Sequence, residues 1–116
     1  MDMNMLFVYG TLKKGHGNHA RFMSEAEYVG TGTTDAKWGL ADLGAFPALT
    51  FGQLSVEGEV YRVTDSQLSE IDRLEGVAHG LYFRELIPIN VNGEKVDCNT
   101  YIMLDLHNYE LSTRWD

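Results

Sequence analysis

The sequence predicts an α+β domain in which about six strands form a strongly curved sheet, flanked by one or two helices. Apolar and β-branched runs typical of strands recur along the chain, whereas only residues 65–75 carry a strong helical pattern. Twelve glycines against two prolines favour a small sheet that turns tightly and closes into a small barrel. A length of 116 residues fits one domain, spanning residues 1–116.

Six segments have the composition of strands, and the last two are predicted to form a hairpin. Asn92-Gly93 is a type I′ turn signal, and it separates these two strands. Gly58 lies inside the fourth strand, where a glycine indicates a bulge or a close backbone approach. The expected strands are 5–9, 28–34, 37–43, 56–63, 82–91 and 94–104, residues 46–49 are an expected loop, and the last dozen residues predict no element.

Two segments predict helices. Thr64 and Gln67 have the spacing of a capping box, so a helix is expected directly after Thr64. Gly76 is the residue expected to end that helix. A shorter helix is expected over residues 19–25, with Asn18 as its N-cap.

Charge and cysteine content exclude several classes of partner. A net charge of -8 repels phosphate backbones and anionic lipid surfaces, so we expect neither nucleic acid nor a membrane as partner. No apolar run has the length of a membrane span, and the N-terminus lacks the positive region of a signal peptide. With Cys98 as its one cysteine the chain has no internal disulfide, and a cytoplasmic location is expected.

The end of the second helix carries an unusual carboxylate. With about 100° per residue and Leu68 at 0°, Ile71 falls near 300° and Glu75 near 340°. Glu75 therefore lies within the apolar arc of the helix, in the last turn, where the helix dipole also disfavours a negative charge. Burial and the dipole both raise the pKa of such a carboxyl, as a proton shuttle near neutrality requires. The alternative is a glutamate that turns outward into solvent at a helix end.

The remaining candidate groups do not form a metal or nucleotide site by their spacing. His16 and His19 are three residues apart but straddle a turn with no third ligand nearby. His79 and His107 are isolated and expected in loops, and Cys98 is expected to be buried. The glycines of residues 10–17 fit neither common phosphate-loop pattern, so no nucleotide site is expected.

Four stretches together resemble the gamma-glutamyl cyclotransferase-like superfamily, which includes gamma-glutamylamine cyclotransferases and AIG2-like proteins. The stretches are "FVYGTLKKGHGNH", "VEGEVYRV", "LSEIDRLEG" and "LYFREL", in the family's order and spacing. The likeness covers roughly residues 5 to 104. It implies a mixed β-barrel with flanking helices and a reaction in which a γ-glutamyl amide closes to 5-oxoproline and releases a free amine.

The resemblance also implies the site. The position of the family's catalytic glutamate is Glu75, and the substrate-binding positions are Tyr9, Gly10, Thr11, Leu12 and Tyr82. One carboxyl group with a raised pKa can take a proton from the substrate's α-amino group and later give one to the leaving amine. Backbone N–H groups at a glycine-hinged loop can hold the substrate carboxylate or the oxyanion. No metal or organic cofactor is needed.

The leading hypothesis is a cyclotransferase for γ-glutamylamines, with γ-glutamyl-ε-lysine as one candidate substrate. Thr11 and the Lys13-Lys14-Gly15 run resemble the amine-acting branch of the family. The expected partner is a small molecule, and the expected state is a monomer or weak homodimer. Two alternatives stay open: a non-catalytic protein of the same fold that binds a small carboxylate, and an enzyme acting on a different small amide.

Overall fold

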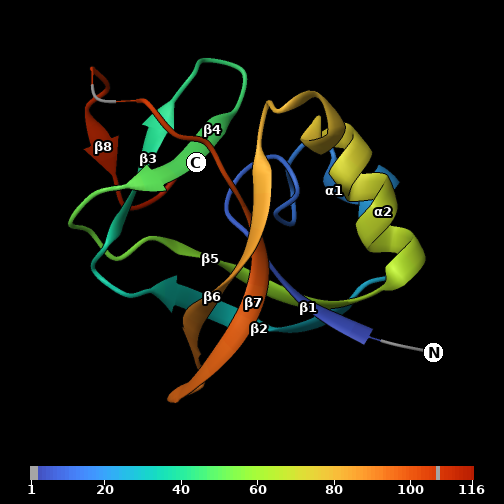
Figure 1. Cartoon of the computed structure of the whole chain (residues 1–116). Coiled ribbons are helices and arrows are strands. Elements are labelled where there is room, and N and C mark those ends of the chain that lie inside the picture. The colour runs from blue at the N-terminus through green and yellow to red at the C-terminus, as the bar shows by residue number, and fades with distance from the viewer. Residues whose placement is uncertain (1–2, 107) are drawn as a thin grey trace.

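The computed structural model describes residues 3–106 and 108–116 as a curved sheet with helices packed against one side (Figure 1). The prediction for His107 lies outside the described residues. The strands are β1 (Met3–Val8), β2 (Glu27–Thr34), β3 (Trp38–Asp42), β4 (Pro47–Phe51), β5 (Glu57–Thr64), β6 (Phe83–Val91), β7 (Glu94–Ile102) and β8 (Leu111–Ser112). The helices are α1 (His19–Phe22), α2 (Asp65–Leu74) and the single 3-10 turn η1 (Val77–His79).

Five of the strands close into a barrel. They follow the order β1-β5-β2-β6-β7, and β1 pairs again with β7, in parallel, at Leu6 and Asn99. The strands β4, β3 and β8 continue outward from β7, where Leu49 pairs with Ile102, also in parallel. The other neighbours are antiparallel. The predicted α+β class and mixed barrel are confirmed.

Glycine lets two strands of the barrel approach each other closely. A Cβ atom on Gly58 would lie 2.4 Å from the carbonyl oxygen of Val8 and 2.7 Å from the Phe7 ring. The close backbone approach expected at Gly58 is therefore confirmed. At the far end of the barrel, Asn92 and Gly93 both have positive φ, 52° and 84°, as the predicted type I′ hairpin turn requires.

Residues 46–49 were expected to form a loop, and this is wrong. Strand β4 begins at Pro47 and pairs along its length with β3, from Asp42 opposite Pro47 to Trp38 opposite Phe51. The first residue of a strand tolerates proline, and the strand forms because Ala48 and Leu49 are fully buried. The last dozen residues, which predicted no element, contribute the short edge strand β8 beside β3.

Helix α1 is shorter than the expected 19–25. It ends at Phe22, and the chain turns at once, because the N–H of Ala26 bonds back to the carbonyl of Met23. Asn18 precedes this helix, but its side chain makes no cap bond to the backbone. Helix α2 has the predicted capping box, with Thr64 and Gln67 exchanging side-chain to backbone hydrogen bonds.

Strand β1 is buried on both faces and divides the core in two. Phe7 packs inside the barrel with residues such as Val60 and Ile89. Leu6 and Val8 point the other way, into a cluster that includes the buried face of α2. Of the site residues that the sequence predicts, Leu12 and Tyr82 belong to this second cluster, and Tyr9 belongs to the first. Across the described residues, no helix has the length and apolar character needed to span a membrane.

Candidate active site

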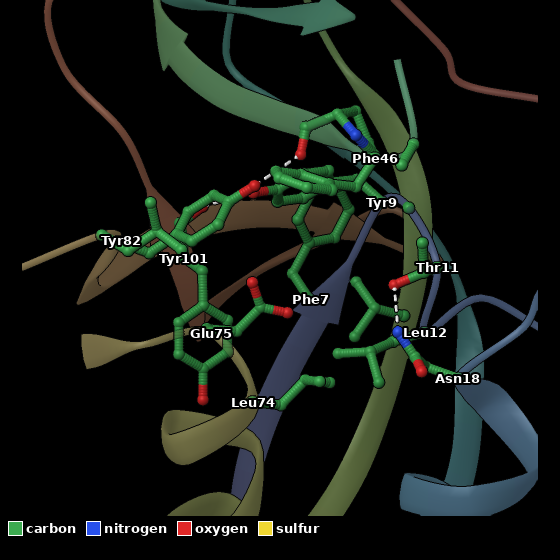
Figure 2. Close-up of a pocket in the computed structure, with 15 residues that line it drawn as sticks. Phe7, Tyr9, Thr11, Leu12, Asn18, Phe46, Leu74, Glu75, Tyr82 and Tyr101 are labelled. Carbon is green, nitrogen blue, oxygen red and sulfur yellow. Dashed lines mark hydrogen bonds between the residues drawn. The ribbon is translucent and has the colours of Figure 1, made fainter. Parts of the chain in front are cut away.

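A cavity of about 350 Å³ opens where β1 ends, between the barrel wall and the C-terminal end of α2 (Figure 2). Its walls come from residues 7–12, from residues 45–47 around the start of β4, and from residues 81–82 before β6, with Tyr101 of β7. The structure brings all six sequence-predicted site residues to this cavity. They are Tyr9, Gly10, Thr11, Leu12, Glu75 and Tyr82.

The carboxyl group of Glu75 faces the cavity from the end of α2 (Figure 2). Glu75 is the C-cap, and its own N–H still bonds to the carbonyl of Ile71 at 2.9 Å. Gly76 follows with φ 65°, the left-handed conformation that ends the helix and turns the chain away. The side chain is half-buried, and burial raises its pKa from 4.5 to about 7. Glu75 therefore does not turn outward into solvent.

The two predicted tyrosines have their hydroxyl groups bound to the main chain. Tyr9 donates to the carbonyl oxygen of Tyr101 at 2.6 Å and accepts from the N–H of Leu49 at 3.2 Å. Tyr82 donates to the carbonyl oxygen of Pro47 at 2.8 Å (Figure 2). Burial raises the pKa of each phenol above its ordinary value, so both hydroxyl groups stay protonated and neutral. Both residues form part of the cavity wall, and their hydroxyl groups bond to main-chain groups of β4 and β7.

In the loop Gly10–Leu12 the carbonyl groups and the N–H groups differ in their hydrogen bonding. The three carbonyl oxygens, in chain order, accept from Lys13 N–H, Asn18 N–H and His19 Nδ1, at 3.0, 3.0 and 2.9 Å. The three N–H groups of the loop have no hydrogen-bond partner anywhere in the described part of the chain. Successive unpaired N–H groups beside a cavity are the usual backbone site for an anionic oxygen.

Gly10 is required by packing against the opposite wall. A Cβ atom at this position would lie 2.7 Å from both Cγ and Cδ of Pro47. Glycine at this position therefore lets the loop lie directly against the Pro47 ring. Beside it, the amide of Asn18 donates to the Thr11 hydroxyl at 2.9 Å (Figure 2). Asn18 thus fastens the loop to α1 instead of capping the helix.

Tyr101, Phe46 and Asn18 are among the residues that line the cavity but were not assigned to the site from the sequence. Tyr101 had no distinguishing signal, since it is one aromatic residue within a long strand. Phe46 fell in the segment that was expected to be a loop. Asn18 did carry a signal, a polar side chain beside a short helix, but an N-cap was the commoner meaning of that pattern.

The histidines and the cysteine have other surroundings. The ring of His16 lies 5.3 Å from the ring of Trp115, and His19 is tied to the loop carbonyl described above. His79 ends the 3-10 turn η1. Residues 3–106 and 108–116 contain no group of three side chains suited to hold a metal ion. Cys98 is buried in the barrel, which raises its pKa to about 11 and makes the thiolate scarce.

Residues 6–116 match the family model described as "Gamma-glutamyl cyclotransferase, AIG2-like". A relative from Vibrio cholerae is 42% identical over 74 residues, which make up 64% of this chain and 64% of that protein. The alignment thus spans slightly less than two thirds of that relative. The gamma-glutamylcyclotransferase family protein YtfP of Escherichia coli K12 is 38% identical over 82 residues, which cover 71% of this chain and 70% of YtfP.

A solved structure supports the same relationship. The crystal structure of an AIG2-like protein from Mus musculus superposes with a TM-score of 0.89. It is 26% identical in sequence, and the match covers 100% of this chain and 90% of the mouse chain. The similarity therefore includes the five-stranded barrel, the outer strands and the helices that frame the cavity.

Proposed function

Because the chain belongs to the gamma-glutamyl cyclotransferase, AIG2-like family, we propose that it converts γ-glutamyl amides to 5-oxoproline. In this reaction the α-amino nitrogen of the γ-glutamyl group attacks the γ-carbonyl carbon of the same group. A new C–N bond closes the five-membered ring, the amide C–N bond breaks, and the amine leaves. Starting from the ammonium form, the attacking nitrogen loses two protons, one before and one after the attack. The leaving nitrogen gains two and departs as an ammonium ion, so the reaction needs no oxidant and no covalent enzyme intermediate.

One observation carries the proposal: Glu75 and the loop Gly10–Leu12, whose N–H groups have no partner among the described residues, line the same cavity. A pKa of about 7 leaves comparable populations of carboxylate and carboxylic acid near neutral pH. The carboxylate takes a proton from the substrate ammonium, whose pKa is roughly 8. The resulting acid then donates that proton to the departing amine. One group therefore performs both transfers in turn.

The loop N–H groups supply the electrostatic part of the proposed mechanism. The substrate presents two oxygen groups that need donors, its α-carboxylate and the oxyanion formed when the γ-carbonyl is attacked. Loss of one oxyanion donor typically raises the barrier by about 3–4 kcal/mol. Because both reacting atoms belong to one substrate, a cavity that holds it folded also gains a proximity effect of up to ~7–11 kcal/mol.

The lining favours γ-glutamylamines over γ-glutamyl amino acids. Among the residues described as lining the cavity, Glu75 is the only one with a charged side chain. The leaving group of a γ-glutamyl amino acid carries a carboxylate beside its nitrogen. The described lining offers this carboxylate no cationic side chain, and the Glu75 carboxylate would repel it. Apolar surface is available instead from Phe46 and Leu81. This agrees with Thr11 and the Lys13-Lys14-Gly15 run, which resemble the amine-acting branch.

The test compares Glu75→Gln with the matched control Glu70→Gln, which alters an exposed glutamate of the same helix. Each protein is incubated with γ-glutamyl amides of monoamines, of the lysine ε-amine and of amino acids, and 5-oxoproline is measured. Glu75→Gln is expected to lower kcat by roughly 100- to 10,000-fold while substrate binding persists. Glu70→Gln is expected to match the unaltered protein.

Two results would contradict the proposal. Unchanged turnover in Glu75→Gln would remove this side chain from the mechanism. Binding of the whole panel by the unaltered protein without any 5-oxoproline would indicate the non-catalytic alternative.

A further inference from the structure

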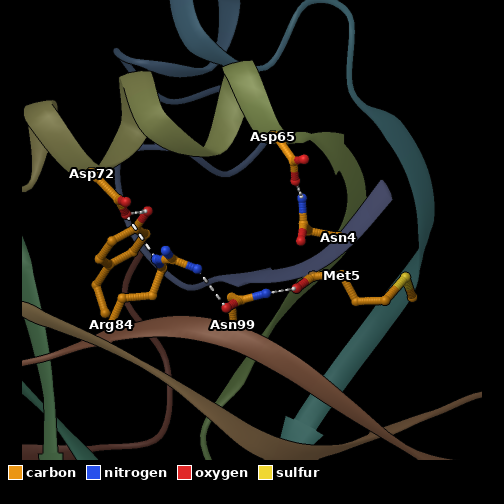
Figure 3. A network of polar contacts seen from close by, with 7 residues as sticks. Asn4, Met5, Asp65, Asp72, Arg84 and Asn99 are labelled. Carbon is orange, nitrogen blue, oxygen red and sulfur yellow. Dashed lines mark hydrogen bonds and ion pairs between the residues drawn. The ribbon is translucent and has the colours of Figure 1, made fainter. Parts of the chain in front are cut away.

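A chain of polar contacts runs behind the cavity and links α2 to three strands (Figure 3). Oδ1 of Asp72 accepts from the Tyr101 hydroxyl at 2.6 Å and from Nε of Arg84 at 3.0 Å. Nη1 of Arg84 donates to Oδ1 of Asn99 at 2.8 Å. The amide of Asn99 in turn donates to the carbonyl oxygen of Met5 at 3.1 Å. Helix α2 is thereby joined to β7, β6 and β1.

This network holds the turn of the helix that carries Glu75. Asp72 precedes Glu75 by three residues, so both lie on the same side of α2. Tyr101 has its ring in the cavity wall, while its hydroxyl reaches back to Asp72 and its carbonyl oxygen accepts from Tyr9. Leu68 and Ile71 are the buried residues of α2, whereas Leu74 in the last turn is only partly buried against the same cluster. The polar contacts therefore add to the weaker apolar packing of the turn that precedes Glu75.

A separate hydrogen bond holds the N-terminal end of α2, and it can be compared with the contacts of Asp72 near the C-terminal end. The amide of Asn4 donates to Oδ1 of Asp65 in the first turn at 2.7 Å (Figure 3). This contact joins the helix to β1 but lies away from the cavity, because neither residue belongs to the lining. The two ties differ in which turn of the helix they hold.

We propose that Asp72, oriented by Arg84, is a positioning residue that acts through Tyr101 to keep the Glu75 carboxyl turned into the cavity. Its catalytic consequence rests on the proposed function, whereas its effect on the position of Glu75 does not. If the tie is cut, the last turn moves away from the barrel and water reaches the carboxyl. Glu75 then becomes a weaker base in a less suitable place.

The surroundings of Glu75 let this movement be followed by titration. The titratable groups that face it are the phenols of Tyr9, Tyr82 and Tyr101, all held neutral by burial. On its own helix the nearby charges are Asp72, paired with Arg84, and the exposed Arg73. Desolvation is thus the main influence on the carboxyl, and hydration of Glu75 is expected to lower the pH at which it titrates.

The experiment uses Tyr101→Phe, which removes only the hydroxyl and keeps the ring in the wall, together with Asp72→Ala. Asn4→Ala is the matched control, since it cuts the tie at the other end of the helix. Proteins labelled with ¹³C at the glutamate carboxyls are titrated by NMR, and the Glu75 signal is assigned by its absence in Glu75→Gln. The pH profile of kcat/KM is measured in parallel.

In Tyr101→Phe and Asp72→Ala the Glu75 midpoint is expected to fall by about one pH unit, with kcat lowered roughly tenfold. Asn4→Ala is expected to keep the original midpoint. An unchanged midpoint in folded Tyr101→Phe, or an equal fall in Asn4→Ala, would overturn the inference. Since the NMR titration needs no turnover, this result is separate from failure of the proposed reaction. If Asp72→Ala does not fold, Tyr101→Phe alone decides.

Discussion

Glu75 owes its properties to its surroundings, since the same residue type at position 70 lies on the exposed side of the same helix. At position 75 the side chain follows the apolar face of α2 into the cluster beside β1, and burial raises its pKa to about 7. A carboxyl placed in this way destabilises the folded protein when it is ionised, because the unfolded chain hydrates the charge better. The group that suits the proposed chemistry is therefore expected to lower stability above neutral pH.

This leads to a prediction for the pH dependence of stability. The folded pKa of Glu75 is about 7 and the unfolded pKa is 4.5, so between these values the folded protein binds more protons. The free energy of unfolding should thus fall as pH rises from 4.5 to 7, by at most about 3 kcal/mol from this group. Thermal unfolding of Glu75→Gln and the unaltered protein should agree near pH 4, with Glu75→Gln more stable at pH 8. Equal melting temperatures at both pH values would show that the carboxyl is hydrated.

Helix α2 places this residue, because the position of Glu75 depends on where the helix begins and ends. The capping box at Thr64 and the left-handed Gly76 define the two ends. A shift of one residue would rotate the side chain by about 100° around the helix axis and out of the cavity. The local signals at the helix ends are thus part of what orients the site.

The capping box can be tested directly. Thr64→Ala removes the hydroxyl that accepts from the N–H of Gln67 at 3.1 Å. The free energy of unfolding, measured in urea, is expected to fall by about 1 kcal/mol, within a usual range of about 0.5–2 kcal/mol. Ser66→Ala, at an exposed position in the first turn, is the control and should change little. Equal losses in the two variants would mean that the hydroxyl of Thr64 does not stabilise the helix.

The loop at the end of β1 is the second element that shapes the cavity. In Gly10→Ala the added methyl group would meet the Pro47 ring at 2.7 Å, so either the loop or Pro47 must move. Displaced donors should lower kcat/KM for a γ-glutamyl amide by roughly 10- to 100-fold. Gly17→Ala is the matched control, because a Cβ atom there meets nothing within 4 Å. Full activity in Gly10→Ala would argue against a role for the loop backbone.

At the scale of the whole molecule, barrel closure brings the end of β1 next to α2. The barrel closes because β1 lies between β5 and β7. At one residue of β5, a side chain would collide with β1. That residue is Gly58, beside the Val8 carbonyl and the Phe7 ring. The cavity lies beside this point, because residues 7–12 form part of its wall.

Gly58→Ala should therefore destabilise the entire fold. A methyl group 2.4 Å from a backbone oxygen cannot be accommodated by a side-chain rotation, so the strands must separate. The expected loss in the free energy of unfolding is at least about 2 kcal/mol, measured by urea denaturation. Gly17→Ala again serves as control, with an expected change within about 0.5 kcal/mol. A stable Gly58→Ala protein would mean that β1 and β5 can part without cost.

The sequence by itself determined the features that depend on neighbours in the chain. The capping box, the end of α2, the Asn92-Gly93 turn and the apolar position of Glu75 all follow from residues fewer than twelve positions apart. Resemblance of four short stretches to a known family supported the barrel and added the candidate site residues. Each of those stretches is also local.

Only the tertiary structure decided the features that need contacts between distant segments. Strand β4 forms because Ala48 and Leu49 are buried in the folded protein, and no local pattern around Pro47 announces this. Tyr9 and Tyr101 line the same cavity although 92 residues separate them, and the Tyr9 hydroxyl donates to the Tyr101 carbonyl oxygen. Whether the N–H groups of the Gly10–Leu12 loop are hydrogen-bonded likewise depends on the partners that the fold offers, and the described residues offer none. Closure of the barrel brings these groups together, and no segment of the chain contains that information alone.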